Sequence, residues 1–247
     1  MRGDAARFID LSCDLGEAAT AAEDLAEARI WTLVTSANVA CGGHTGDAAS
    51  MRRAAERART YSVALGAHPS YPDRAHFGRR TMAISAAALV DSLVEQVGAL
   101  AEAAGEAGLR LEHVKPHGAL YNDAHRDRPL ADSIVAAVVR LDAGLAIVGS
   151  PGSALLASAR QAGVKTIREG FADRRYRADG TLVPRAEEDA LVVDAQAAAV
   201  QALARAEAGA DTICIHADMP GSAERLEAIR AALRAAGFGF RSHAARR

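Results

Sequence analysis

The sequence predicts an α/β fold built as a single βα barrel of about seven or eight strands. Two observations predict it. Ala-rich segments with helical spacing repeatedly precede short β-prone runs, and polar, Gly-rich stretches follow nearly every such run. No linker, low-complexity run or change in composition divides the chain, so we expect one domain that spans residues 1–247.

Glycines mark the expected transitions from helix to strand. A glycine just past a helix adopts a left-handed conformation without a Cβ clash, and it therefore stops the helix. Helical spacing is clear at 85–104 (SAAALVDSLVEQVGALAEAA) and at 222–236 (SAERLEAIRAALRAA). The glycines that stand before β-prone runs are Gly108, Gly144, Gly163, Gly209 and Gly237.

Eight strands are expected along the chain, in alternation with helices. Their predicted ranges are 8–13, 33–37, 63–66, 109–114, 145–149, 164–169, 210–216 and 238–243. Strands separated by helices predict a parallel sheet.

Composition and charge limit the classes of function. Half of the residues are hydrophobic and the formal net charge is −2, which does not favour nucleic acid or an anionic membrane as a partner. The first residues lack the apolar core of a signal peptide, and no stretch reaches the roughly 20 apolar residues of a membrane helix. Three cysteines do not make a disulfide framework. We therefore expect a cytoplasmic protein, and the composition leaves a homo-oligomer open.

Six polar stretches follow predicted strands. They are SCDLGE (12–17), SANVACGGHTGD (36–47), GAHPSYPD (66–73), HVKPHGALYN (113–122), EGFADRRY (169–176) and IHADMPG (215–221). In a closed βα barrel the loops after the strands meet at one face, where active sites lie. An open doubly wound sheet would bring together only the loops at its switch point. The distribution therefore favours a barrel with one site built from all six stretches.

Lys115 is an unusual residue in this chain. Arginine supplies nearly all of the 29 Lys and Arg residues, and lysine occurs only at Lys115 and Lys165. Positions 113, 115 and 117 share one face of a strand, so His113 and His117 would flank the lysine. We expect desolvation to lower the pKa of Lys115 and to make it an acid, a base or an anion anchor. The alternative is a lysine that pairs with a carboxylate.

Several other polar residues also have structural explanations. Asp14 and Glu17 lie in a strand-to-helix turn, where acids favour the helix dipole, and this explanation fits Glu17 better. Asp47 can cap the helix that follows it. A lone buried histidine is more often structural than functional, but several histidines stand at predicted strand ends, namely His44, His68, His117 and His216. The three cysteines are expected to pack at strand ends: Cys13, Cys41 and Cys214.

A divalent metal site is a further hypothesis. Asp14, His44 and His68 offer one carboxylate and two imidazoles from three successive strand ends. No close-spaced motif such as H-E-x-x-H supports it. The chain also lacks the phosphate-binding motif G-x-x-x-x-G-K-[ST], so we expect no standard ATP site on this chain alone.

The stretch after the sixth predicted strand is long and charged. Asp179 and Gly180 predict a turn and a small hairpin. Asp173, Arg174 and Arg185 could bind a carboxylate, since arginine offers a bidentate fork. The alternative is a charged, solvated loop.

Together, the polar stretches resemble the LamB/YcsF family in order and spacing. The resemblance rests on DLSCDLGE, SANVACGGHTGD, GAHPSYPD with FGRRTM, HVKPHGALYN, FADRRY with LVPR, and CIHAD, and it runs from about residue 8 to residue 235. It implies a sugar-deacetylase-like βα barrel. It also implies a 5-oxoprolinase, an ATP-dependent cyclic amide hydrolase that opens 5-oxoproline to L-glutamate with partner subunits B and C. ATP would be a co-substrate handled partly by those partners.

The resemblance and the residues together suggest roles for the site. The catalytic candidates, as bases on water or as groups that stabilise charge or protonate the departing nitrogen, are Asp14, His44, Lys115 and His117. The substrate-binding candidates are Glu17, Asn38, His68, Arg79, Tyr121, Asp173, Arg174, His216 and Asp218. Arg79 or Arg174 would hold the substrate carboxylate.

The chain departs from the family pattern at a few positions. The family usually has Asn, Phe, Ala, Gly and Gly at the positions of Ser12, Gly43, Thr45, His76 and Ala217. We expect the differences at Gly43 and His76 to reshape the pocket. Two other functions stay open at this point: a metal-dependent amidohydrolase or deacetylase that acts alone, and a non-catalytic regulatory subunit that binds a lactam.

Overall fold

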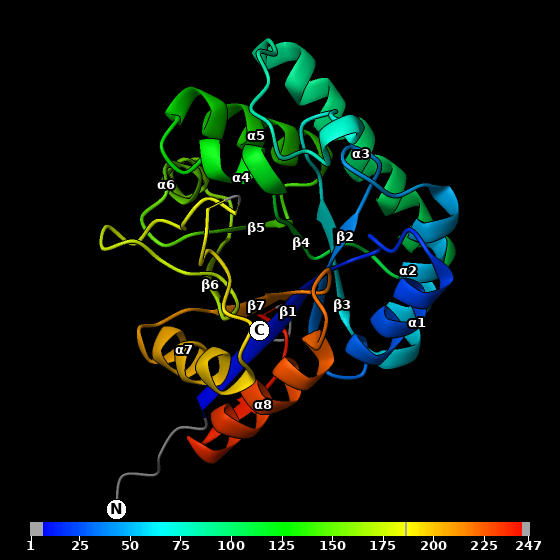
Figure 1. Ribbon diagram of the computed structural model, residues 1–247. Coiled ribbons are helices and arrows are strands. Elements are labelled where there is room, and N and C mark those ends of the chain that lie inside the picture. Colours follow the sequence, from blue (N-terminus) through cyan, green and yellow to red (C-terminus); the bar gives the residue numbers. More distant parts are fainter. Residues whose placement is uncertain (1–6, 186, 244–247) are drawn as a thin grey trace, which may run out of the picture.

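The computed structural model describes residues 7–185 and 187–243 and contains a closed parallel βα barrel (Figure 1). Seven strands form the ring, and β8 pairs with the first residues of β1. The strands are β1 (Arg7–Leu15), β2 (Ser36–Ala40), β3 (Ala64–His68), β4 (His113–Val114), β5 (Ala146–Gly149), β6 (Thr166–Phe171), β7 (Thr212–His216) and β8 (Phe238–Phe240). The prediction of a βα barrel with seven or eight strands is confirmed.

Helices surround the strands in Figure 1 and alternate with them along the chain. They are α1 (Ala21–Ile30), α2 (Ala48–Tyr61), α3 (Ala86–Glu106), α4 (Gly118–Asp123), α5 (Arg128–Leu141), α6 (Ala154–Gln161), α7 (Ala195–Glu207) and α8 (Ser222–Ala235), with a short 3₁₀ helix at Arg74–His76. Asp47 caps α2, as predicted, because its Oδ1 accepts a hydrogen bond from the Ser50 backbone N–H at 2.8 Å. Within the described residues, no helix has both the length and the apolar character needed to cross a membrane.

β1 closes the ring and also shows how the barrel interior becomes polar. Residues 12–15 pair with β2, and residues 10–14 pair with β7. Side chains alternate between the two faces of a strand. Leu11, Cys13 and Leu15 join the apolar core, while Asp10 and Asp14 lie on the opposite face and are buried too. The interior of this barrel is therefore lined in part by charged groups that must find partners inside it.

The strand register places four residues in one row across neighbouring strands. Asp14 lies beside Asn38, Asn38 beside Gly66, and Gly66 beside His113. β4 is shorter than the predicted range 109–114, but Lys115 N–H donates to the Ala67 carbonyl at 2.9 Å and so continues the pairing with β3. Lys115 is therefore held at the end of a strand, as the sequence predicts.

Two of the differences from the predicted element ends have a clear local cause. β2 begins at Ser36 rather than at 33, because Leu33 and Val34 still donate backbone hydrogen bonds to Ile30 in the turn that ends α1. Gly144 was expected to stop a helix, and this prediction was wrong. α5 already ends at Leu141, and Gly144 N–H donates to Asp142 Oδ1 at 2.7 Å without a left-handed conformation. The other glycines predicted to stop helices have positive φ angles: Gly108, Gly163, Gly209 and Gly237.

The segment between β6 and α7 folds back on itself, as the turn at residues 179 and 180 predicts. Tyr176 pairs with Leu182 in an antiparallel bridge, and Arg174 pairs with Leu191. Gly180 takes a φ of 81° at the tip, a conformation that favours glycine. This segment carries Arg174 and Arg185 toward the mouth of the barrel, where both line a pocket.

Glu27 on α1 gives a pH-dependent contribution to stability. Burial raises its pKa to about 7, although its Oε1 accepts a hydrogen bond from Gly16 N–H. The favourable contribution of the protonated group is complete below the unfolded pKa of 4.5 and is lost as pH rises through about 7. At 1.36 kcal/mol per pKa unit, the loss is about 3 kcal/mol. Glu27→Gln should remove most of this dependence, and urea unfolding at pH 5 and pH 8 measures it; an unchanged pH dependence would contradict the assignment.

Candidate active site

A pocket of about 280 Å³ lies at the carboxyl ends of the barrel strands. Five of the six polar stretches contribute to it, each from a loop that follows a different strand. Predicted site residues that line it are Asp14, Glu17, His68, Arg79, Lys115, His117, Tyr121, Arg174 and His216. Four other predicted residues do not line the pocket but contact side chains that do, namely Asn38, His44, Asp173 and Asp218. The structure thus brings together residues that lie far apart in the sequence.

Lys115 forms the centre of a buried ionic cluster. Its Nζ lies 2.8 Å from Asp14 Oδ1 and 2.8 Å from Glu169 Oε1, and its side chain is only 2% exposed. Cys214 Sγ lies 3.2 Å away. Burial alone would lower the pKa of Lys115, but the charges of the two carboxylates outweigh it and hold the pKa well above its usual range. The expectation of a lowered pKa was therefore wrong, because the lysine is desolvated together with two counter-ions.

Glu169 was not among the predicted site residues. It lies in β6, is buried, and its Oε1 reaches Lys115 Nζ at 2.8 Å. The available signal was an acidic residue at the end of the predicted strand 164–169, where the stretch EGFADRRY begins. A lone acid at a buried strand position needs a charged partner, and this chain has a single buried lysine to offer among the described residues.

Asp14 is oriented by a chain of hydrogen bonds inside the barrel. Asn38 Nδ2 donates to Asp14 Oδ1 at 2.9 Å, and Asn38 Oδ1 lies 2.7 Å from His113 Nε2. An amide oxygen only accepts, so His113 carries its hydrogen on Nε2. Gly66 leaves room for this ring, because a Cβ there would stand 2.0 Å from His113 Nε2. Burial and the neighbouring His243 lower the pKa of His113 to about 3, which keeps the ring neutral.

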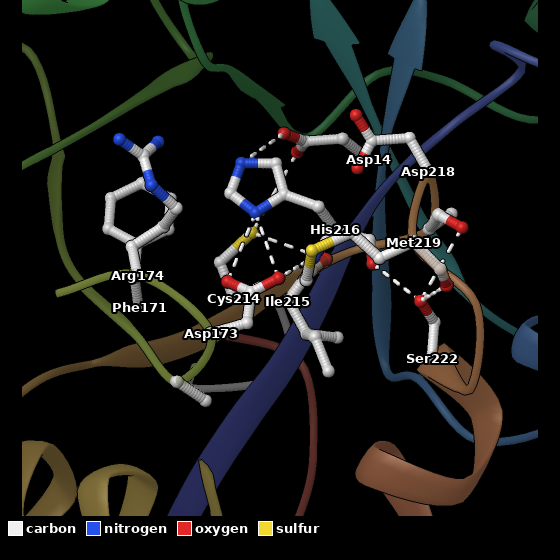
Figure 2. A network of polar contacts seen from close by, with 12 residues as sticks. Asp14, Phe171, Asp173, Arg174, Cys214, Ile215, His216, Asp218, Met219 and Ser222 are labelled. Atoms are coloured by element: carbon white, nitrogen blue, oxygen red, sulfur yellow. Dashed lines mark hydrogen bonds and ion pairs between the residues drawn. The ribbon is translucent and has the colours of Figure 1, made fainter. Parts of the chain in front are cut away.

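His216 and Asp173 form an ion-paired dyad that faces Asp14. Figure 2 shows the His216 ring between the carboxylates of Asp173 and Asp14. His216 Nδ1 lies 3.0 Å from both oxygens of Asp173, and its Nε2 lies 3.7 Å from Asp14 Oδ2. Phe171 stacks on the ring at a centroid distance of 5.6 Å. Burial alone would lower the pKa of His216, but Asp173 and Asp14 raise it above the usual value.

Asp14 itself stays ionised. Burial would raise its pKa, but His68 and Lys115 outweigh burial and hold the pKa well below the usual range. His68 Nε2 lies 3.2 Å from Asp14 Oδ2. A carboxylate with such a low pKa is a weak base near neutral pH. Its geometry suits it to orient and charge-balance the groups around it.

Three histidines pack together on the other side of the pocket. His44 stacks on His117 at a centroid distance of 3.7 Å, and His44 Nε2 lies 3.0 Å from Glu17 Oε1. Burial, followed by the charge of His68, lowers the pKa of His117 well below its usual value. The structural explanation offered for Glu17 does not apply, because α1 begins only at Ala21 and Glu17 turns toward the histidines.

The protons on His68 and His117 follow from their partners. His68 Nδ1 lies 2.8 Å from the carbonyl oxygen of Lys115, and His117 Nε2 lies 3.0 Å from that of Phe77. A carbonyl only accepts, so both of these nitrogens carry hydrogen. The two remaining nitrogens, His68 Nε2 and His117 Nδ1, face each other at 3.0 Å. His68 Nε2 also lies 3.2 Å from Asp14 Oδ2, so a hydrogen added there can be donated to Asp14, and without that hydrogen both nitrogens can face a cation.

A set of metal-ligand atoms gathers at this point. The donor atoms of Glu17, His68 and His117 lie within 4.8 Å of one another. Both histidines donate their outer N–H to a backbone carbonyl, the arrangement that commonly orients metal-binding histidines. One carboxylate and two imidazoles suit a divalent cation with open positions. The set shares only His68 with the predicted set, since His44 is bonded to Glu17 and Asp14 lies against Lys115.

Three arginines also line the pocket, namely Arg79, Arg174 and Arg185. Arg79 and Arg185 share one carboxylate, Asp218, at 3.0 Å and 2.6 Å. Arg174 is buried and forms no ion pair among the described residues, and burial together with Arg185 and Arg79 lowers its pKa. Three guanidinium groups beside one carboxylate leave this wall positively charged. Such a wall suits the carboxylate of a substrate.

The departures from the family pattern lie outside the pocket lining. A Cβ at Gly43 would stand 2.2 Å from Gln96 Oε1. Gln96 lies on α3 and accepts a hydrogen bond from the Ser70 backbone N–H, so Gly43 faces α3 and the start of the loop after β3. His76 is exposed and pairs with Asp73 at 2.7 Å. The expectation that these two positions reshape the pocket is not supported. The three cysteines are buried, as predicted: Cys13, Cys41 and Cys214.

The sequence matches the profile of the LamB/YcsF family over residues 9–247. The chain belongs to the LamB/YcsF family. A relative from Chloroflexus aggregans, named as the A subunit of 5-oxoprolinase, is 44% identical over 247 residues, with 95% of this chain and 98% of the relative covered. The name of that relative describes one subunit of a multi-subunit enzyme.

Solved structures agree with this membership. The structure of a lactam utilization protein from Thermus thermophilus superposes with a TM-score of 0.86 at 38% identity, and the match covers 95% of this chain and 99% of that one. The catalytic domain of a peptidoglycan N-acetylglucosamine deacetylase from Eubacterium rectale gives a TM-score of 0.53 at 10% identity, covering 96% and 88%. The second likeness concerns the fold alone, and it confirms the expected deacetylase-like barrel of this LamB/YcsF chain.

Proposed function

We propose that this chain is the A subunit of an ATP-dependent 5-oxoprolinase, which hydrolyses the lactam of 5-oxoproline to L-glutamate while ATP becomes ADP and phosphate. One observation carries the proposal. A single pocket combines a histidine–carboxylate dyad, a buried lysine and a positively charged arginine wall. The names of the relatives and their identity to this chain support the same assignment.

The proposed reaction overcomes the low reactivity of a lactam. Phosphoryl transfer from ATP to the amide oxygen makes that oxygen part of a leaving group. A first water then adds to the ring carbon, and the C–N bond breaks as the ring nitrogen receives a proton, which leaves an acyl phosphate. A second water hydrolyses this acyl phosphate to the new carboxylate and free phosphate. Such a reaction needs a group that moves protons, a fixed positive charge near the reacting oxygen, and an anchor for the substrate carboxylate.

His216 is the group best suited to move the protons. Its Nδ1 is oriented by Asp173, so Nε2 faces the pocket. Its pKa is raised by Asp173, whereas those of His44 and His117 are lowered by burial. A histidine whose pKa is raised above its usual value accepts a second proton more readily, so it can take a proton from water and give one to nitrogen. We therefore assign the acid–base role to His216 in preference to Asp14 or His44.

Lys115 supplies a fixed positive charge in this mechanism. Its raised pKa keeps the ammonium group protonated, so it stabilises negative charge on the reacting oxygen and does not exchange protons. Asp14 and Glu169 hold the ammonium group in position from two sides. His117 and His68 line the same end of the pocket and contact the water or the ring.

The arginine wall holds the substrate carboxylate. Arg79 lines the pocket and shares the carboxylate of Asp218 with Arg185, so part of its guanidinium fork stays available for the carboxylate of the substrate. A bidentate contact from a guanidinium group orients the ring with its amide toward Lys115 and His216.

The division of work between the proposed subunits gives a direct test. The isolated chain lacks a phosphate-binding loop and should not hydrolyse ATP, with or without 5-oxoproline. Adding partner subunits B and C should produce phosphate and glutamate in equal amounts. Phosphate release and glutamate formation measured on the same samples check this. Robust ATP hydrolysis by the isolated chain would contradict the proposed division.

A metal-dependent amidohydrolase that acts alone is the second candidate, and the set Glu17, His68 and His117 favours it. A bound divalent cation would polarise a carbonyl or lower the pKa of water. Zinc titration by calorimetry, with metal analysis of the purified chain, tests for the cation. His68→Asn should weaken binding by about 10- to 100-fold, whereas His76→Asn, at a surface histidine, should not. Lactam hydrolysis without ATP and partners would favour this candidate over the first.

A further inference from the structure

A second pocket of about 210 Å³ adjoins the candidate active site. The two pockets share a wall formed by Tyr121, Asn122, Arg174, Leu182 and Pro184. We call the second one the arginine pocket. Its polar lining includes Arg126, Arg174, Arg177, His125, Ser150 and Thr181, and no Asp or Glu is among its described lining residues. This lining offers many hydrogen-bond donors and no negative charge, which suits an anion.

Arg174 is the element that joins the two pockets. Arg174 is 6% exposed, and its Nη2 donates to the Val183 carbonyl at 2.7 Å. Its Nε is buried without a hydrogen-bond partner among the described residues. A buried guanidinium group without a counter-ion is unfavourable. The like charges of Arg185 and Arg79 increase the cost. An anion at this wall would relieve it.

Arg126 and Arg177 line the arginine pocket but not the active-site pocket. Arg126 contacts Asp179 at 3.2 Å and Arg177 contacts Glu187 at 2.7 Å, and all four side chains are about half exposed or more. Exposed pairs of this kind contribute little and are screened by solvent. The two arginines can therefore turn to an anion in the pocket at small cost.

The charges of the two pockets are arranged with a clear direction. Asp14 and Glu17 line the active-site pocket alone, Arg174 lines both pockets, and Arg126 and Arg177 line the arginine pocket alone. A group with two negative charges is repelled by the two carboxylates and attracted to the arginine pocket. In the proposed reaction, the group of that charge is the phosphoryl group, which is bonded directly to the amide oxygen of the ring.

We propose that the arginine pocket binds a phosphoryl group, with Arg126, Arg174 and Arg177 as its cationic contacts. The inference rests on the proposed function for the placing of the ring, but phosphate binding can be measured without turnover. The phosphoryl group can arrive on the lactam or on a nucleotide, and both present the same terminal oxygens to the guanidinium groups.

The test is titration of the purified chain with inorganic phosphate at constant ionic strength, followed by calorimetry. The double variant Arg126→Ala, Arg177→Ala removes the two exposed contacts. The control variant Arg128→Ala, Arg140→Ala removes two exposed arginines that do not line the arginine pocket and that pair with Asp132 on α5 and Asp91 on α3. We expect the first variant to weaken phosphate binding by about 10-fold or more and the control to leave it unchanged, since only the first removes charge-assisted contacts.

The outcomes separate the inference from its alternatives. Phosphate should also raise the melting temperature of the wild type and the control, but not of the first variant. Equal weakening in both variants would show only general attraction to positive charge and would overturn the inference, as would a wild type that binds no phosphate. Competition by ADP would support a nucleotide as the source. Phosphate binding without such competition would support arrival on the lactam. Loss of lactam turnover with phosphate binding intact would count against the proposed function alone.

Discussion

Replacing His216 with asparagine should lower the rate of glutamate formation by the assembled enzyme by about 10²–10⁴-fold, the range for loss of a positioned acid–base group. Asparagine keeps an N–H that can reach Asp173, and the His216 backbone N–H continues to donate to Asp173 at 2.7 Å. The buried carboxylate therefore keeps partners, and we expect the melting temperature to change little. Steady-state rates and thermal unfolding on the same preparation measure both effects.

The pH profile separates a chemical role of His216 from a structural one. Asp173 is the charge that does most to raise the pKa of His216 against burial. Asp173→Asn should therefore lower that pKa and move the corresponding limb of the rate profile to lower pH. His76→Asn, which breaks an Asp–His pair on the surface, serves as the control and should leave rate and profile unchanged. A His216→Asn enzyme that keeps more than about a tenth of the wild-type rate would rule out the acid–base role.

The position of the site could be predicted because the rule behind it is topological. Loops after parallel strands meet at one face of a barrel, whatever the details of the strands. Asp14, His68, Lys115 and His216 each stand at or just after a strand end, and all four line the pocket. This prediction tolerated errors in strand ends, such as the late start of β2, since a shift of a few residues does not move a loop to the other face.

The partners of each side chain could not be predicted in the same way. Lys115 pairs with Asp14, 101 residues away, and with Glu169 on β6. These contacts cross the barrel, and they depend on strand register and on which face each side chain takes. The sequence predicted a desolvated Lys115, but the sign of its pKa shift depends on the number of carboxylates that are buried with it.

Glu17 shows a different limit. The stretch EAATAAED contains more than one residue that can begin a helix. The capping box of Thr20 and Glu23 begins α1 at Ala21 and leaves Glu17 outside the helix. Only then can its carboxylate reach His44. Local preference did not show whether Glu17 or Glu23 would lie in the first turn of the helix. The capping box at Thr20 decides this, because it starts the helix after Glu17.

Lys115→Arg should lower the rate of glutamate formation by about 10²-fold or more in the reconstituted enzyme, the usual scale for a charge positioned at the reacting atoms. The ammonium group fits between carboxylate oxygens at 2.8 Å on either side, with the Phe171 ring centroid 5.1 Å away. A planar guanidinium group cannot occupy the same point and forces its neighbours apart. We expect a cost of about 1–3 kcal/mol in stability from overpacking, too small to prevent folding.

Lys165→Arg is the matched control, since Lys165 is the other lysine of the chain and is exposed. It should change neither rate nor melting temperature. If Lys115→Arg also kept the wild-type rate, the reaction would not need a compact ammonium group at this point. The role assigned to Lys115 in the mechanism would then be wrong.

Lys115→Met separates charge from shape. Methionine fills similar space but leaves Asp14 and Glu169 buried without their shared cation, which should destabilise the fold by about 3–5 kcal/mol near neutral pH. In the wild type, the lowered pKa of Asp14 contributes stability that is present above its unfolded value of 3.8 and is lost as pH falls further. Without Lys115 the carboxylates can be buried only when protonated, so the stability gap between the two proteins should narrow as pH falls toward 4. Unfolding by urea from pH 4 to pH 8 measures that gap. A constant gap would mean that Lys115 contributes packing and not charge to this barrel.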